Sequence, residues 1–515
     1  MPNCANDDAV VKTSIVAQGG VALPASFVPS FILDPNGERA MYRQLYDWFQ
    51  QAIVDGQLRP GQRVPSSRSL AAELQISRIP VFNAYEQLCA EGYLETFVGA
   101  GTRVARSIPD DELRLAHGKR RQASQRSLAA AGPRRKSHRA AVLTNAVPQP
   151  WLNTFGAFRV SVPALDHFPI GTWSRLVGRH SRALHWETMA YGDAMGHAPF
   201  REAIAEYLPT VRGVRCQASQ ILVTTGSQQA LQICAHVLLD QEDSVAVEDP
   251  GYPGARQAFL ASGAQLIPVP VDDEGMQVGE LICRQNSVRA VYITPSHQYP
   301  LGVTMSASRC MQLLNWAALK GTWIIEDDYD SEYRFGSRPI VSLQGLDKHA
   351  RVVYIGTFSK VLFPAIRLGY VVVPQDLVPA FSAYRDAADI FPSTLYQAVV
   401  TDFIREGHFA RHIRRMKMLY MERRNCLVQA LNAELGRTLQ VIGSGAGMHL
   451  VALLPRGVDD SLIASEAAER GISAMPLSSC YLHRAKRRGL ILGYGGTNEH
   501  QIKQAMRALK TIMER

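Results

Sequence analysis

The first hundred residues show the spacing of short helices. Apolar side chains recur at every third or fourth position across residues 40–55, which predicts a first helix. A short second helix follows, with Ser66 or Ser67 as its cap, and a third helix carries Pro80 near its first turn, where a missing backbone N–H costs nothing. A glycine-bounded hairpin comes next. This order of elements predicts a winged helix-turn-helix domain over residues 37–106.

The pattern changes beyond residue 150, where short runs of β-branched residues recur. Helical stretches at 229–239, 306–319 and 396–433 lie among or after these runs. Apolar runs without polar alternation are typical of strands that are buried on both faces. We therefore expect residues 149–515 to form an α/β domain with a seven-stranded, mostly parallel sheet. The expected strands are 221–224, 244–247, 265–267, 290–293, 322–325, 352–355 and 368–373.

Composition narrows the class of protein. Apolar residues make up 46% of the chain and charged residues 20%, as in ordinary globular proteins. The eight cysteines are scattered without a C-x-x-C pair, so we expect neither a disulfide framework nor a metal site, and a reducing cytoplasm as the location. No apolar run reaches the roughly 18 residues of a membrane helix, so no membrane partner is expected. Residues 1–36 are expected to form a flexible extension.

The net charge of +9 is concentrated in one stretch. Residues 37–105 carry seven basic and seven acidic side chains, whereas residues 106–150 carry ten basic and three acidic ones. One interpretation is a solvated linker over residues 107–148 that repels itself and stays extended. The other is a tether that also contacts nucleic-acid phosphates without sequence preference. Both interpretations can hold together.

Polar residues directly follow five of the expected strands. Ligands of open α/β sheets bind at the carboxyl ends of the strands, so five polar segments there indicate a single site. A lysine or aspartate taken alone is more often a surface or turn residue. The segments are 226–229, 248–252, 294–298, 326–329 and 357–360.

The residue types in these segments suit a phosphorylated pyridinium cofactor. Gly226 precedes a helix whose free N–H groups favour a phosphate, and Arg367 could add a charged donor. Lys360 could form a Schiff base while Asp327 keeps a ring nitrogen protonated. Two tyrosines complete the expected site, with Tyr329 donating to a phenolic oxygen and Tyr252 stacking on the ring.

At this point the chain resembles a known family. Residues 40–104 resemble a GntR-family winged helix through G-x-L-x-P-G-x-x-x-P-S-x-R-x-L-A, followed by S-R and A-Y-x-x-L-x-x-E-G-Y-L. Residues 150–515 resemble a fold-type I aminotransferase, with E-D-D-Y-D-S-E-Y, T-F-S-K and P-S-H-Q-Y-P as specific strings. The two in this order, with a long linker, are similar to the MocR subfamily of transcription regulators.

The resemblance implies roles for individual residues. It implies that Lys360 binds pyridoxal 5'-phosphate (PLP) covalently, that Asp327 pairs with the pyridine nitrogen and that Tyr329 pairs with the ring hydroxyl. It also implies a domain-swapped homodimer in which Tyr191 reaches the phosphate across the interface. The implied phosphate ligands are Ser227, Gln228, Thr357 and Arg367, and the implied contacts to double-stranded operator DNA are Arg68, Ser77 and Arg78.

Two positions depart from the family pattern. Ile491 stands where related enzymes that act on amino acids carry an arginine for the α-carboxylate, with Arg487 and Arg488 nearby but out of register. Gly254 stands where GABA-responsive members carry a second arginine. A buried carboxylate without a partner is costly, so an amino-acid ligand is less expected than PLP itself.

Three functions are compatible with these features. The first is a transcription regulator whose large domain senses PLP, or a small amine or amino acid, and the second is a working aminotransferase with a fused DNA-binding module. The third is a dimerisation scaffold with vestigial cofactor binding. Lys360 with Asp327 argues against the third, and Ile491 argues against the second. We therefore expect a PLP-linked regulator without efficient transaminase turnover.

Overall fold

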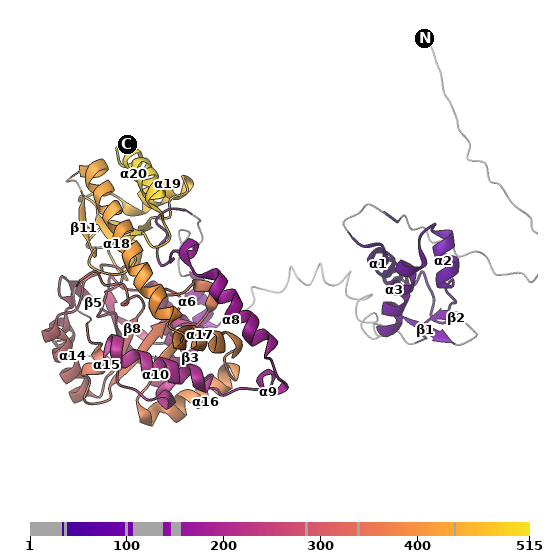
Figure 1. The fold of residues 1–515 in the computed structure, drawn as a ribbon, viewed down its shortest axis with the longest axis horizontal. Helices are drawn as coiled ribbons and strands as arrows, with labels where there is room; N and C mark the ends of the chain where they lie inside the picture. The colour runs from indigo at the N-terminus through magenta and orange to yellow at the C-terminus, as the bar shows by residue number, and fades with distance from the viewer. Residues whose placement is uncertain are drawn as a thin grey trace, which may run out of the picture. The chain divides into compact units, whose positions relative to one another are not determined.

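The computed structural model describes most of the chain as two separate compact units, shown in Figure 1. The first unit comprises residues up to Arg135 and the second begins at Lys136. The expected extension at 1–36 lies outside the described residues except for positions 33 and 34. The described residues are 33–34, 39–97, 101–106, 137–145, 156–283, 287–336, 340–436 and 439–514.

The first unit is the predicted winged helix-turn-helix. Its elements are α1 (Met41–Val54), α2 (Ser67–Glu73), α3 (Arg78–Ala90), β1 (Leu94–Phe97) and β2 (Gly101–Val104). Ser66 caps α2, because its Oγ accepts a hydrogen bond from the Ser69 backbone N–H at 3.1 Å. One face of α3 packs into the core through Val81, Ala84, Tyr85 and Leu88. Strands β1 and β2 pair antiparallel, and residues 98–100, between them, lie outside the described residues.

The second unit begins with a helix that the sequence did not predict. Helix α6 (His138–Asn145) falls within the stretch expected to be a flexible linker, and it packs against α12 (Pro253–Ser262). These residues are therefore helical rather than extended. Residues 107–136 and 146–155 lie outside the described residues, so the rest of the linker prediction stays a prediction.

The large sheet has eight strands, in the order β3-β10-β9-β8-β7-β4-β5-β6. All seven predicted strands are present, and the short hairpin strand β6 is an unpredicted addition. The core pairs β5–β4–β7–β8–β9 are parallel, whereas β10 and β6 pair antiparallel to their neighbours. The bounds are β3 (Ile221–Thr224), β4 (Ser244–Asp249), β5 (Gln265–Asp272), β6 (Gly275–Met276), β7 (Ala290–Ile293), β8 (Trp323–Asp328), β9 (Val352–Thr357) and β10 (Gly369–Val372).

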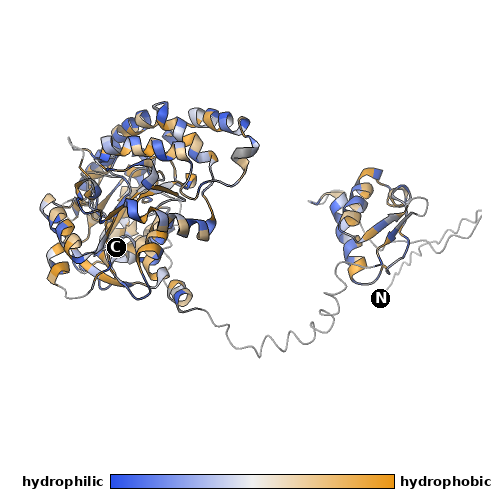
Figure 2. Cartoon of the chain, turned by 90° about the horizontal axis from the view of Figure 1, so that it is seen from below, coloured by the Kyte–Doolittle hydropathy of each residue, from blue (hydrophilic) through white to orange (hydrophobic). Residues whose placement is uncertain are grey.

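Helices cover both faces of this sheet. In β4, Val245 and Val247 join a core cluster with α11 (Ser227–Leu238) and α12, while Ala246 joins another with α13 (Val278–Cys283) and α14 (Ala307–Lys320). Because neighbouring side chains of a strand point to opposite faces, both faces need apolar residues. Figure 2 shows the outer helices as mixtures of hydrophobic and hydrophilic residues, as expected for helices with one buried side.

The predicted helical stretch 396–433 is two helices rather than one. Helix α17 (Leu395–Arg405) ends before Gly407, whose φ of 74° lies in the left-handed region, and α18 (His408–Leu435) begins after it. Glycine adopts this conformation without steric cost, so the chain can turn there. Further helices of the second unit are α8 (Ile170–Arg182), α9 (Trp186–Met189), α10 (Ala198–Arg212), α15 (Leu343–Leu346) and α16 (Val378–Asp389).

A second, smaller sheet was not predicted. It is antiparallel, with the order β11-β12-β14-β13, and α18, α19 (Asp460–Glu469) and α20 (Glu499–Met513) gather at the same end of the unit (Figure 1). Its strands are β11 (Gln440–Ile442), β12 (His449–Leu453), β13 (Met475–Pro476) and β14 (Gly489–Gly493). Within the described part of the chain, no helix combines the length and the apolar character needed to cross a membrane.

Candidate functional site

The strand register brings polar segments predicted from the sequence to one edge of the large sheet. Asp327 on β8 lies opposite Ile355 on β9, and Thr357 at the end of β9 lies opposite Gly369 on β10. Gly369 in turn pairs with Thr224, just before Gly226. The polar segments at the ends of β8 and β9 and directly after β3 therefore meet, as expected for strand ends in an open α/β sheet.

Asp327 offers one unpaired oxygen at this edge. Its Oδ2 accepts a hydrogen bond from the Tyr292 hydroxyl at 2.8 Å, and its Oδ1 is buried without a hydrogen-bond partner among the described residues. Burial is the main cause that raises the pKa of Asp327 to about 7; Asp328 adds to the rise, and the Tyr292 hydrogen bond and Lys360 oppose it. A buried oxygen with no partner fits a charged N–H donor such as a protonated pyridine nitrogen.

Lys360 lies half-buried in the turn after β9. Its Nζ donates a hydrogen bond to the Ser161 carbonyl oxygen at 3.1 Å. Burial lowers the pKa of Lys360 to about 8, while Asp330 and Asp327 act in the opposite direction and Arg367 adds to the lowering. An amine with this pKa is partly neutral near pH 7, which is the form that attacks an aldehyde.

The start of α11 forms a cradle for an anion. Gly226 has a φ of 98°, and Arg367 lies so close that a Cβ on Gly226 would be 3.1 Å from its guanidinium. Ser227 opens the helix, so its first N–H groups have no partner within the helix. A missing side chain, free N–H groups and an exposed arginine together fit a phosphate.

Two other predicted phosphate ligands make hydrogen bonds within the protein. The Gln228 side-chain amide donates to the Gly254 carbonyl oxygen at 3.0 Å. The Thr357 Oγ1 accepts from the Ser359 backbone N–H at 3.2 Å. Gln228 therefore offers its backbone N–H to the cradle, and Thr357 keeps its hydroxyl hydrogen for donation.

Three tyrosines line one side of the edge. The rings of Tyr252 and Tyr299 lie 5.5 Å apart, and those of Tyr299 and Tyr329 lie 6.0 Å apart, both edge to face. The Tyr329 hydroxyl lies 3.0 Å from His297 Nδ1. His297 belongs to the segment 294–298 that the sequence singled out, but no role was predicted for it.

The two departures from the family pattern lie beside these tyrosines. Ile491 on β14 is fully buried in an apolar cluster with Val451 and Met475, and Tyr252 and Tyr329 pack against that cluster. Neither nearby arginine replaces the missing one, since Arg487 is exposed and Arg488 pairs with Asp459 at 2.6 Å. A Cβ on Gly254 would lie 2.5 Å from the Tyr252 ring, so any side chain there requires Tyr252 to move.

Tyr191 lies on the surface of the second unit. Its side chain is 82% exposed, and its ring makes an edge contact with Phe391 at 5.9 Å. It belongs to a stretch that exposes several large apolar side chains, which are Ile170, Leu184, Trp186 and Met189.

In the first unit, the three predicted DNA contacts are all exposed around the start of α3. Ser77 precedes α3 with extended backbone, and its side chain makes no capping hydrogen bond. Arg78 Nε donates to Ser67 Oγ at 3.1 Å, which ties α3 to α2, and Arg68 lies on α2. These two helices therefore present both arginines and Ser77 to solvent.

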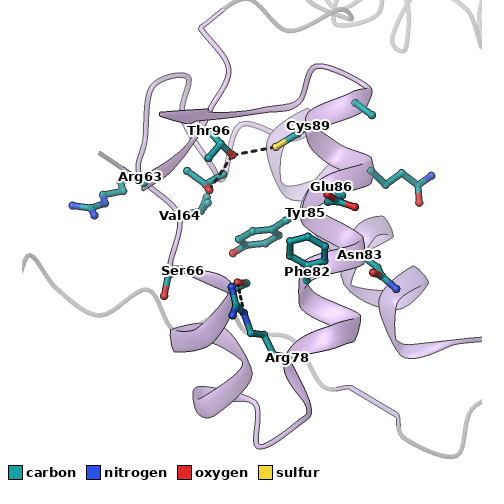
Figure 3. Close-up of a pocket in the computed structure, with 15 residues that line it drawn as sticks. Arg63, Val64, Ser66, Arg78, Phe82, Asn83, Tyr85, Glu86, Cys89 and Thr96 are labelled. Atoms are coloured by element: carbon teal, nitrogen blue, oxygen red, sulfur yellow. Dashed lines mark hydrogen bonds between the residues drawn. The ribbon is translucent and has the colours of Figure 1, made fainter. Parts of the chain in front are cut away.

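A groove of about 950 Å³ lies between α3 and the hairpin. Figure 3 shows Arg78 at the start of α3 and Phe82 and Asn83 one turn further along, with Arg63 across the groove. Ile79, Phe82 and Asn83 are exposed on the side of α3 opposite its buried face. Sequence reasoning missed these residues, although the helical period that identified the buried face also defines this exposed one.

Comparison with known proteins agrees with this two-part organisation. The family model "Bacterial regulatory proteins, gntR family" matches residues 41–104, and "Aminotransferase class I and II" matches residues 179–509. The chain is 38% identical to the "Probable rhizopine catabolism regulatory protein MocR" of Rhizobium meliloti, covering 93% of this chain and 95% of that protein.

Two further similarities bear on the large unit. The chain is 29% identical to the HTH-type pyridoxine biosynthesis transcriptional regulator PdxR of Corynebacterium glutamicum, covering 92% of this chain and 95% of that protein. It resembles the solved α-aminoadipate aminotransferase LysN of Thermus thermophilus, complexed with N-(5'-phosphopyridoxyl)-L-leucine, with a TM-score of 0.65 and 27% identity over 74% of this chain and 95% of that one. The chain therefore belongs to the MocR subfamily of GntR-family transcription regulators, with a DNA-binding winged helix and a PLP-binding domain of the fold-type I aminotransferase class.

Proposed function

We propose that this regulator responds to PLP itself, and that occupation of the large unit changes the affinity of the winged helix for its operator. The observation that carries the proposal is the pairing of a polar cofactor edge with an apolar wall at Ile491. The edge offers a donor or acceptor for each charged part of PLP. The wall offers no cation to an amino-acid carboxylate, and burying that charge unpaired is costly.

The proposed roles follow from the geometry of the edge. PLP supplies an aldehyde for covalent attachment and an electron-withdrawing pyridinium ring. Lys360 provides the amine, Asp327 accepts from the ring N–H through Oδ1, and Tyr329 donates to the phenolic oxygen. Tyr252 covers the ring. The phosphate is bound by the backbone N–H groups at the start of α11, and Ser227, Gln228, Thr357 and Arg367 are the residues that contribute.

Operator contacts are proposed for the exposed residues around α3. Arg78 can bind a guanine edge bidentately, and Arg68 and Ser77 can contact the duplex beside it. Arg78→Ala is expected to weaken specific operator binding by about 1–3 kcal/mol, if the side chain reads a base edge, without changing PLP binding. Arg39→Ala is the control, because Arg39 pairs with Asp47 at 3.3 Å and does not line the groove. Equal losses in the two variants at fixed salt would contradict this assignment.

We further infer that the regulator acts as a homodimer in the cytoplasm. The apolar side chains exposed around α8 and α9, with Trp186 77% exposed, form a face that fits a second copy of the chain. Tyr191 projects from the same stretch, consistent with a tyrosine that reaches the phosphate of a partner subunit. Exchange of the winged helices between the two copies is part of the same proposal.

Family membership alone leaves the effector open between an amine and the cofactor. One relative is named for rhizopine catabolism and another for pyridoxine biosynthesis. A ligand shifts a regulator only as far as it binds two states differently. An empty site and a PLP-filled site differ by the ordering of the cradle at Gly226 and by the charge on Lys360. This difference favours PLP.

Operator titration of the PLP-free and PLP-loaded full-length proteins tests the proposal. The two affinities are expected to differ by about 1–3 kcal/mol, a typical coupling free energy. Amino acids added to the loaded protein are expected to leave the titration unchanged. Lys360→Ala is the matched control, since it should lose the response to PLP while keeping operator binding. Coincident curves, followed by a shift with an amine or amino acid, would overturn the proposal in favour of an amine sensor.

Steady formation of keto acid from common amino acids separates this proposal from the aminotransferase alternative. The similarity to a solved aminotransferase is what favours that alternative. The expected result is no sustained turnover, because Ile491 provides no grip on the substrate carboxylate.

A further inference from the structure

A buried histidine–aspartate pair lies behind Tyr329. His297 Nδ1 is 2.9 Å from Asp330 Oδ1 and 3.0 Å from the Tyr329 hydroxyl, so one ring nitrogen faces both groups. His297 is 3% exposed and Asp330 1%. Neither residue was given a role by the sequence, and neither is among the residues proposed above to contact PLP.

The position of one hydrogen decides what Tyr329 can do. If Nδ1 of His297 carries the hydrogen, that one hydrogen is shared between Asp330 Oδ1 and the Tyr329 oxygen in a three-centre bond, and the Tyr329 hydroxyl only accepts from it. If Nδ1 is bare, the Tyr329 hydroxyl donates to His297, and its single hydrogen is used up. The tautomer of His297 therefore sets the direction in which Tyr329 donates.

The surroundings favour the hydrogen on Nδ1. His297 Nε2 has no hydrogen-bond partner among the residues that the structure describes, so a hydrogen there would be a buried donor without an acceptor. That tautomer would also turn the Nδ1 lone pair toward the Asp330 carboxylate at 2.9 Å. Both penalties disappear when Nδ1 carries the hydrogen.

The pair is held tightly by the backbone around it. A Cβ on Gly447 would lie 2.1 Å from His297 Cε1 and 2.5 Å from Asp330 Oδ2, and a Cβ on Gly302 would lie 3.0 Å from His297 Nε2. On the other side, His449 donates from Nε2 to the Pro300 carbonyl at 3.1 Å, and burial and then His297 lower its pKa to about 4, so it stays neutral. The ring of His297 cannot turn without displacing these neighbours.

We propose that His297 and Asp330 are positioning residues that keep the Tyr329 hydroxyl hydrogen free for the phenolic oxygen of the cofactor. This inference rests on the role proposed for Tyr329 above. Asp330 holds the hydrogen on Nδ1, Nδ1–H occupies a lone pair of the tyrosine oxygen, and the remaining O–H bond points to the cofactor site. No bond is made or broken in this arrangement.

Several titratable groups face the pair, and the Tyr329 hydroxyl among them stays protonated. Burial, followed by the charge of Asp330, raises the pKa of Tyr329 well above its usual value, so the hydroxyl keeps its hydrogen. The groups that face the pair are Asp327 on β8, Glu248 on β4, Tyr299 after β7, Lys360 after β9 and His449 on β12.

The consequence can be measured on bound PLP. A donor to the phenolic oxygen stabilises the form in which that oxygen carries an unshared negative charge, so it lowers the pH midpoint of the cofactor's visible absorbance change. Loss of the donor raises the midpoint. Tyr329→Phe should raise it by about one pH unit, as expected for one hydrogen bond to a charged oxygen.

The test is a pH titration of visible absorbance in the PLP-loaded full-length protein and its variants. His297→Phe should raise the midpoint as Tyr329→Phe does, and the double variant should show no further rise. His297→Gln should restore the midpoint, because its amide N–H can donate to Asp330. A midpoint that stays unchanged in His297→Phe would overturn the proposal.

A second variant covers the case in which His297→Phe does not fold. Asp330→Leu is then titrated alone and in the Tyr329→Phe background. Without the Tyr329 hydroxyl, the substitution can change the midpoint only through the lost charge of the Asp330 carboxylate. A larger upward shift in the wild-type background supports the proposal, and equal shifts overturn it.

A metal ion in the same place would be incompatible with the proposal. Ligand atoms of His297, Asp330 and His449 lie within 4.8 Å of one another, a spacing that suits a metal ion. A stoichiometric metal in the purified protein, lost in His449→Ala, would overturn the proposal because the metal needs the lone pairs that the hydrogen bonds use. Metal-free protein with an unchanged midpoint in His449→Ala supports it.

These outcomes are distinct from failure of the proposed function. If PLP attaches elsewhere than Lys360, borohydride treatment of Lys360→Ala still fixes it, and the regulator proposal fails. If PLP attaches normally but the midpoint ignores His297, only the positioning role fails.

Discussion

Two walls of the same site have opposite character. On one, Asp327 presents a buried unpaired oxygen, Lys360 has a lowered pKa, and Arg367 lies over Gly226 at the start of a helix. On the other, Ile491 is fully buried among apolar residues. Unpaired polar atoms are costly to maintain unless a ligand pairs with them, whereas a packed apolar wall is stable by itself. The contrast indicates that one wall serves a ligand and the other serves the fold.

The strongest test of the polar wall is removal of the attacking amine. Lys360→Ala should abolish borohydride-fixable PLP, because Lys360 is the amine that the described strand ends place at this edge. Lys320→Ala, at the exposed end of α14, should leave it unchanged. Mass spectrometry of the treated proteins measures the attached cofactor. If Lys360→Ala still carries a full equivalent of borohydride-fixed PLP, the assignment of the polar wall as the cofactor-binding wall is wrong.

Truncating Ile491 in the apolar wall should lower the free energy of unfolding and leave the absorbance of bound PLP unchanged. Ile491→Ala should lower the free energy of unfolding by about 2–5 kcal/mol, the usual cost of truncating a fully buried isoleucine. Denaturant unfolding of the PLP-free protein measures the loss. The absorbance of bound PLP should stay the same, and a marked change would show that Ile491 contacts the cofactor rather than serving only the fold.

Removing the arginine of the cradle should weaken PLP binding moderately. Arg367→Ala should raise the dissociation constant roughly tenfold, near the lower end for a hydrogen bond to a charged group because the side chain is exposed. Arg487→Ala is the matched control, since Arg487 is also exposed but does not lie over Gly226. Fluorescence titration with PLP gives both dissociation constants. Equal values for the two variants would remove Arg367 from the phosphate cradle.

The rate at which the protein captures PLP should depend on pH, and this effect should be smaller than those of the three substitutions above. In the proposed role only neutral Lys360 attacks the aldehyde. Because the pKa of Lys360 is about 8, the capture rate should rise about tenfold per pH unit below that value and level off above it. Asp327, with a pKa of about 7, gains its charge over the same range and strengthens binding of a protonated ring nitrogen. Stopped-flow absorbance measures the rate. A rate that falls with rising pH would contradict the assigned amine.

The sequence predicted the strands and the residues at their ends because those signals are local. A strand buried on both faces requires a continuous apolar run, and the polar residues at or just after the end of that run, such as Asp327, Thr357 and Gly226, are fixed by their position in the sequence. The same holds for α3, whose helical period defined its buried face. Strands β6, β11 and β13 were missed because two or three residues give little periodic signal. Strands β12 and β14 were missed although they are as long as several predicted strands.

The sequence by itself therefore determined the two domains, the polar residues at the strand ends and the apolar residue at position 491. Only the tertiary structure decided what surrounds them. The contact between Tyr329 and His297 joins positions 32 residues apart, and the apolar cluster around Ile491 combines residues from both sheets and their connections. No local pattern encodes such pairs, because they depend on which strands lie side by side. The break of the long helical stretch at Gly407 and the packing of α6 on α12 likewise depend on the fold, since the same sequences could continue as a helix or as a solvated linker.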